Sequence, residues 1–141
     1  MDFLADSNPA LRASPLRARP RGEPCVLIVE DDPAVARAIH RVLSNEPWKF
    51  RSVKSCEEAR TLIATLPYFD VAVIDIHLKD GSGIEVGQEL LAAGAMGEAV
   101  IFSADLGTDS EDARALGTFV HKTEGPERLR DAVRSAMDRA R

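Results

Sequence analysis

The stretch VAVIDIHLKDGSG, residues 71–83, decides the fold of this chain. It opens with Val71 to Ile74 and Ile76, an apolar run rich in β-branched side chains, which is typical of a strand covered on both faces. Asp75 interrupts this run. Burying an ionised carboxylate without a partner costs on the order of several kcal/mol. We therefore expect Asp75 to meet a cation or to lie where the strand ends in a polar pocket.

Strand-like and helix-like segments alternate along the rest of the domain. The strand-like segments are 25–30, 48–53, 71–75, 99–103 and 118–122. The helix-like segments, several of which open with a typical N-terminal residue such as Pro33 or Ser55, are 33–44, 55–66, 83–93, 110–116 and 126–140. Five alternations predict an α/β fold, namely a five-stranded parallel sheet with helices on both faces. The flavodoxin-like, doubly wound strand order 2-1-3-4-5 is a common arrangement of such a sheet and is the order expected here.

The composition fits one soluble domain and little else. The chain has 141 residues, 45% hydrophobic content and a formal net charge of -5, which argues against direct binding of nucleic acid or insertion into a membrane. Residues 1–24 hold four Pro and four Arg without helical or strand periodicity, so we expect a flexible tail before a domain at 25–141. Cys25 and Cys56 lack metal-ligand spacing and are expected to be reduced thiols in a cytoplasmic protein.

Polar residues stand at the carboxyl ends of the predicted strands. In order they are Asp31 and Asp32 (directly after Glu30), Asp75, Ser103 and Lys122. If the first and third strands are neighbours, the acids converge at the point where the winding direction reverses, which is where such sheets bind ligands. Carboxylates that lie so close raise each other's pKa unless a cation neutralises them. Hard oxygen ligands suit Mg²⁺, and Lys122 can pair with Asp75 in its absence.

With these residues in place, the sequence resembles the receiver (CheY-like) domain of bacterial two-component response regulators. The resemblance covers about 24–140. It depends on four motifs at the right strand ends and in the right order: LIVEDD (Leu27–Asp32), VIDIHLKDGSG (Val73–Gly83), the pair Ser103-Ala104, and FVHK (Phe119–Lys122).

The resemblance implies a role for each residue of the site. Asp75 matches the phosphoacceptor, which takes a phosphoryl group from a kinase histidine. Asp32 matches the acid that binds Mg²⁺ directly, Asp31 the acid that assists through water, and the backbone carbonyl of His77 a further metal ligand. By the same match, Lys122 pairs with the phosphoryl group and Ala104 leaves it room, while Ser103 and Phe119 form the switch that responds to it.

Two departures from the family pattern concern the loops around this site. Thr123 follows Lys122, where receivers usually have a proline preceded by a cis bond, and a cis bond before a non-proline residue costs about 2.5–4 kcal/mol. The presence of Gly125 favours a different, trans path over strain. The segment from Ser103 to Lys122 is also shorter than usual by about one helical turn, so we expect a short, mobile fourth helix. The family commonly uses that surface to dimerise or grip partners, so the shortening puts the output contact, including a possible homodimer, in doubt and leaves the phosphorylation pocket intact.

These features predict a stand-alone receiver that is no enzyme beyond slow autodephosphorylation. Its partners would be a sensor histidine kinase or a histidine phosphotransfer protein, and a downstream protein target. The alternatives are a phosphate sink, a degenerate receiver that serves only as a binding module, and a haloacid-dehalogenase-like phosphatase. The phosphatase class needs an Asp two residues after its nucleophile, and this chain has His77 there.

Overall fold

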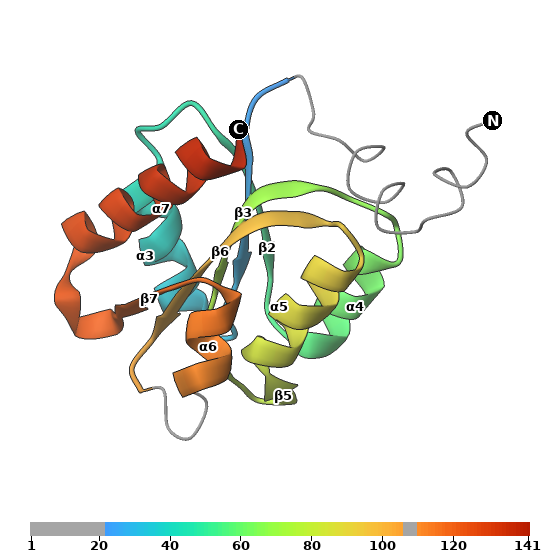
Figure 1. Ribbon diagram of the computed structural model, residues 1–141. Coiled ribbons are helices and arrows are strands. Elements are labelled where there is room, and N and C mark those ends of the chain that lie inside the picture. Colours follow the sequence, from blue (N-terminus) through green and yellow to red (C-terminus); the bar gives the residue numbers. More distant parts are fainter. Residues whose placement is uncertain (1–21, 106–109) are drawn as a thin grey trace.

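The computed structural model describes residues 22–105 and 110–141 (Figure 1). Five strands form one parallel sheet in the order β2-β1-β3-β6-β7, which is the predicted 2-1-3-4-5 order when only these five strands are counted. Their bounds are β1 Cys25–Val29, β2 Lys49–Val53, β3 Phe69–Ile74, β6 Met96–Ser103 and β7 Thr118–His121. The tail predicted at 1–24 lies almost entirely outside the described residues, so its flexibility stays an expectation.

Helices cover both faces of the sheet, as predicted. One layer consists of α3 Pro33–Leu43 and α7 Pro126–Ala140. The other consists of α4 Cys56–Ile63, α5 Gly83–Ala92 and α6 Ser110–Leu116. Figure 1 shows α3 and α7 on one side of the strands and α4 and α5 together on the other. None of the described helices combines the length and apolar character that crossing a bilayer needs.

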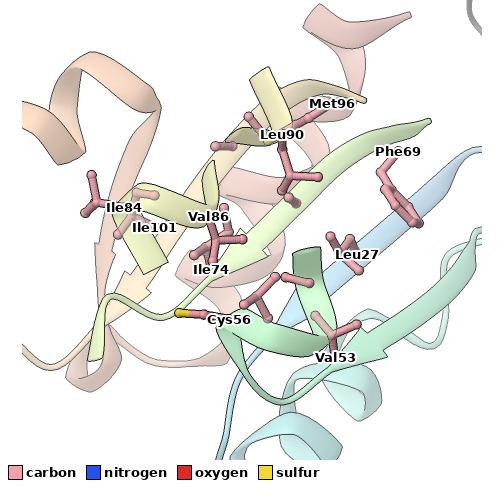
Figure 2. Close-up of a cluster of buried hydrophobic side chains, with 14 of the residues drawn as sticks. Leu27, Val53, Cys56, Phe69, Ile74, Ile84, Val86, Leu90, Met96 and Ile101 are labelled. Atoms are coloured by element: carbon pink, nitrogen blue, oxygen red, sulfur yellow. The ribbon is translucent and has the colours of Figure 1, made fainter. Parts of the chain in front are cut away.

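Strand β3 is the centre of the core because all six of its residues are buried. Its side chains alternate between the two faces, so that Ile74 packs with the α4 and α5 layer while Val73 packs with the α3 and α7 layer. Figure 2 shows the first of these layers, in which Leu90 of α5 and Leu27 of β1 lie in the same cluster. The double coverage explains the continuous apolar pattern of residues 71–74.

The loop that follows Asp75 is more structured than its sequence predicts. It contains a short antiparallel hairpin, β4 His77–Leu78 paired with β5 Gly81–Ser82, before Ser82 caps α5. Gly83 then packs against the backbone of Asp75, so closely that a Cβ on residue 83 would lie 1.8 Å from the Asp75 carbonyl oxygen. This close approach requires glycine and places the start of α5 against the backbone of Asp75.

Two loop expectations concern the last third of the chain. Helix α6 has seven residues, which agrees with the short fourth helix, but residues 106–109 lie outside the described residues and the expected mobility stays untested. After Lys122 the chain makes a 3-10 turn, η1 Lys122–Glu124, and then Gly125 at φ 97°. Every peptide bond in the described ranges is trans. The Thr123 loop therefore takes the rerouted path.

Candidate functional site

The candidate site lies at the carboxyl edge of the sheet, where β1 and β3 are neighbours. The chain continues from β1 to α3 on one face of the sheet and from β3 to α5 on the other. Oxygen atoms of Glu30, Asp31 and Asp75 all lie within 4.8 Å of one another. Glu30 is 3% exposed and Asp75 is 6% exposed. Three acids at such distances repel one another strongly, so this edge of the sheet needs positive charge.

Lys122 supplies part of that charge from the end of β7. Its Nζ lies 3.1 Å from Asp75 Oδ2 and 3.1 Å from Glu30 Oε1. Burial lowers the pKa of Lys122, but the attraction of the nearby Glu30 and Asp75 carboxylates outweighs burial and leaves the pKa raised above its ordinary value. The ammonium is thus charged and holds the two buried carboxylates together.

The remaining oxygen of Asp75 is held by the chain on either side. Asp75 Oδ1 accepts a hydrogen bond from the Ser103 hydroxyl at 2.9 Å and a longer one from the His77 backbone N–H at 3.3 Å. The backbone N–H of Asp75 itself donates to the Val29 carbonyl at 2.9 Å. Both carboxylate oxygens therefore have defined partners, which fixes the direction in which Asp75 faces.

The three consecutive acids after β1 have different surroundings. Asp31 Oδ2 accepts from the Lys79 backbone N–H at 3.0 Å at the rim of the site. Asp32 is the N-cap of α3, where its Oδ1 accepts from the Ala34 N–H at 2.9 Å. The structure does not bring Asp32 into the acid cluster.

Glu30, rather than Asp32, completes the cluster with Asp31 and Asp75. Its N–H donates to the Val53 carbonyl at 3.1 Å, so the β1–β2 pairing continues past Val29 and holds Glu30 at the buried edge. Sequence reasoning noted Glu30 but gave it no role. The available signal was its position directly after a continuous apolar strand, which is where burial is greatest.

The two other predicted residues lie beside this cluster. His77 is exposed in β4, and its Nε2 lies 3.0 Å from the Asp105 carbonyl oxygen. Phe119 is half-buried in β7 against the cluster under α4 and α5, with its ring centroid 6.3 Å from that of His121. The metal-ligand role of the His77 carbonyl and the switch role of Phe119 stay predictions.

The donor set fits a hard divalent cation. All three acids offer oxygen, and Glu30 Oε1 accepts no hydrogen bond from the described residues, its near neighbour being the Lys122 ammonium. Burial is the largest cause of a raised pKa for Glu30, and the nearby charge of Asp75 adds to it. A cation between these acids would offset both effects, and oxygen-only ligands favour Mg²⁺ or Ca²⁺ over softer metals.

A doubly wound sheet with acids and a lysine at its switch point belongs to the class of α/β proteins that bind their ligands at this edge of the sheet. Residues 26–134 match the family model of the response regulator receiver domain. The chain belongs to this family, which confirms the resemblance seen in its motifs. Receivers are the phosphoacceptor modules of two-component systems and bind Mg²⁺ at their acidic pocket.

Individual relatives agree with the family. The chain is 30% identical over 114 residues to the response regulator protein PilR of Pseudomonas aeruginosa, a match that spans 79% of this chain and 25% of PilR. The CheY-like receiver domain protein of Methanospirillum hungatei JF-1 has a TM-score of 0.73 at 20% identity, covering 84% of this chain and 97% of that one. TrrA of Thermotoga maritima, solved in complex with Mg²⁺-BeF, has a TM-score of 0.70 at 20% identity, covering 80% and 98%.

Proposed function

We propose that Asp75 accepts a phosphoryl group from a histidine of a sensor kinase or of a histidine phosphotransfer protein. The observation that carries this proposal is the pair of contacts on Asp75, with Lys122 Nζ at 3.1 Å from one oxygen and Ser103 Oγ at 2.9 Å from the other. A cation and a hydroxyl thus already lie where the oxygens of a transferred group would need partners.

The transfer forms one bond and breaks one. A carboxylate oxygen of Asp75 bonds to phosphorus while the bond between phosphorus and the donor imidazole nitrogen breaks, and the nitrogen keeps that electron pair. The reaction asks mainly for alignment and charge stabilisation. Lys122 would move from Asp75 Oδ2 to a phosphoryl oxygen, and Ser103 would turn its hydroxyl to another.

Glu30, Asp31 and Asp75 are the residues that would hold Mg²⁺, and the His77 carbonyl remains a proposed fourth ligand. When bound, the ion neutralises negative charge that builds up on the phosphoryl oxygens. The direct ligand predicted at Asp32 is replaced in this proposal by Asp31, because Asp32 caps α3. The role of Glu30 is to complete the charge of the cluster from its buried side.

The output of the phosphorylated form would pass to a downstream protein in the cytoplasm. Ser103 and Phe119 would carry the change towards the surface near α6, since both lie on the strands that flank this helix. A role as a phosphate sink, in which Asp75 only drains phosphoryl groups from a kinase, uses the same chemistry. A homodimer also remains a proposal.

The test compares the wild type with Asp75→Asn after incubation with acetyl phosphate and Mg²⁺, read by intact mass. One phosphoryl adduct on the wild type alone supports the proposal. Rapid multiple turnover of the donor without adduct would instead indicate a phosphatase. No adduct with acetyl phosphate, phosphoramidate or a phosphorylated kinase domain would contradict the proposal and leave a binding module.

A further inference from the structure

His77 joins the two segments that enclose Asp75. Its backbone N–H donates to Asp75 Oδ1 at 3.3 Å, and its Nε2 lies 3.0 Å from the carbonyl oxygen of Asp105. A carbonyl oxygen can only accept, so this contact requires that His77 Nε2 carries the proton. The imidazole therefore ties the loop after β3 to the segment after β6, two parts of the chain that are 28 residues apart.

The same carbonyl lies next to Ser103. The Ser103 hydroxyl donates to Asp75 Oδ1 at 2.9 Å and has the Asp105 carbonyl at 3.5 Å as a second, more distant acceptor. Ser103 is fully buried, so its hydroxyl has few other partners to turn to. Holding the Asp105 carbonyl in place thus also holds the backbone that positions Ser103.

We propose that His77 is a positioning residue, whose imidazole fixes the Asp105 backbone and thereby opposes the displacement of Ser103 from Asp75. This inference depends on the proposed function for its consequence, because phosphorylation of Asp75 requires Ser103 to turn towards a phosphoryl oxygen. In this proposal the backbone after Ser103 shifts with this turn, and the His77 contact to the Asp105 carbonyl breaks when it does. His77 therefore sets part of the cost of switching.

The expected size follows from one partly exposed hydrogen bond. Such a bond shifts an equilibrium between two arrangements by about 2- to 10-fold. The effect is specific to the donor at the Nε2 position. A glutamine at residue 77 can place an amide N–H near the same carbonyl, whereas an alanine cannot.

The first experiment uses the unphosphorylated chain and needs no metal or phosphodonor. At pH 8, ¹⁵N NMR of the wild type is expected to show His77 protonated at Nε2. In His77→Ala the amides of Ser103 and Asp105 should exchange about 2- to 10-fold faster with solvent deuterium. They should keep the wild-type rate in His77→Gln and in the matched control His40→Ala, whose ring lies against Phe50.

The second experiment adds Mg²⁺ and titrates beryllofluoride, an analogue of the phosphoryl group. His77→Ala should reach half-saturation at a concentration about 2- to 10-fold lower than the wild type, and His77→Gln should return the curve towards the wild type. Unchanged amide exchange in His77→Ala, or a change that His77→Gln shares in full, overturns the positioning role. A wild type that binds no beryllofluoride contradicts the proposed function instead, and the amide exchange still decides the role of His77.

Discussion

Glu30 and Asp32 flank Asp31 in the sequence but differ in their surroundings. Glu30 is buried beside Lys122, and burial is the main reason why its pKa is raised. Asp32 is exposed and already satisfied by the first turn of α3. We therefore expect Glu30 and Asp31 to contribute to the binding of a divalent cation here, and Asp32 to contribute little.

We expect Mg²⁺ to raise the melting temperature of the wild type, because an ion that binds only the folded state stabilises it. At an ion concentration 100 times the Kd, the gain is about 2.7 kcal/mol. Asp31→Asn and Glu30→Gln should lose most of this gain, since each removes a negative charge from the cluster. Thermal unfolding with and without Mg²⁺ at constant ionic strength measures the difference.

Asp32→Asn is the matched control for these variants. Asparagine is also a good N-cap, so the variant should fold and should keep most of the stabilisation by Mg²⁺. A variant at residue 32 that loses the whole effect, while Glu30→Gln retains it, would restore the assignment made from the sequence.

At the scale of elements, the hairpin β4–β5 joins the site to α4. Asp80 in its turn accepts the backbone N–H of Cys56 at 2.8 Å through Oδ1 and that of Glu57 at 3.0 Å through Oδ2. Its neighbour Lys79 donates its own N–H to Asp31. The first turn of α4 is thus capped from a segment more than 20 residues away, in addition to its local cap at Ser55.

We expect Asp80→Asn to lower the melting temperature at pH 7, because the variant loses the negative charge with which Asp80 stabilises the positive N-terminal end of α4. The hydrogen bond from Cys56, followed by that from Glu57, lowers the pKa of Asp80 below its ordinary value of 3.8. A lowered pKa in the folded state contributes stability above the unfolded value, and this contribution disappears as the pH falls through the folded value. The gap between wild type and variant should therefore shrink below about pH 4.

Thermal unfolding of both proteins between pH 7 and pH 3 measures this gap. Lys79→Ala serves as the control in the same turn, since it keeps the backbone N–H that contacts Asp31. A gap that stays constant or widens towards pH 3 would mean that the Asp80 charge does not cap α4.

At the scale of the whole molecule, the parallel sheet and the two helix layers could be predicted because they follow from the alternation of strand-like and helix-like periodicity. The strand order was expected as a common arrangement of such sheets, and the pairing of β1 with β3 confirms it. The apolar run at 71–74 and the helical spacing at 33–43 each report burial within one element. The motif order then points to the family, which the match over 26–134 confirms. Strand β6 nevertheless begins at Met96 rather than at residue 99. Gly97 and Glu98 hide the strand pattern in the sequence, although Met96 pairs with Phe69 and Glu98 with Val71 of β3.

The composition of the site was harder to predict than its place. Glu30, Asp31 and Asp32 are consecutive acids with the same chemistry, and the continued pairing of Glu30 with β2 holds Glu30 at the buried edge. The hairpin after Asp75 is too short to give a periodic signal. The contact from His77 to Asp105 depends on where two loops end in space, which neither loop encodes locally.

The edge of the sheet opposite the site carries a second buried acid. Asp70 of β3 is 0% exposed, accepts the Cys25 N–H at 2.8 Å, and has the Arg141 guanidinium 3.4 Å from both carboxylate oxygens. Arg141 also donates to the Gly22 carbonyl at 3.1 Å. Figure 1 shows the C-terminus at this edge, far from the hairpin β4–β5. One guanidinium thus holds the start of β1, the start of β3 and the end of α7 together.

Because these elements belong to different parts of the sheet, loss of the Arg141 contact should affect global unfolding. We expect Arg141→Ala to lower the free energy of unfolding by about 1–3 kcal/mol, since it leaves the buried Asp70 carboxylate with less positive charge nearby. Arg128→Ala is the matched control on the same helix. It removes an ion pair with Glu124 whose side chains are both 42% exposed, and exposed pairs contribute only about 0–1 kcal/mol. Urea unfolding at pH 7 compares the two variants, and equal losses would show that burial of Asp70 does not govern this edge of the molecule.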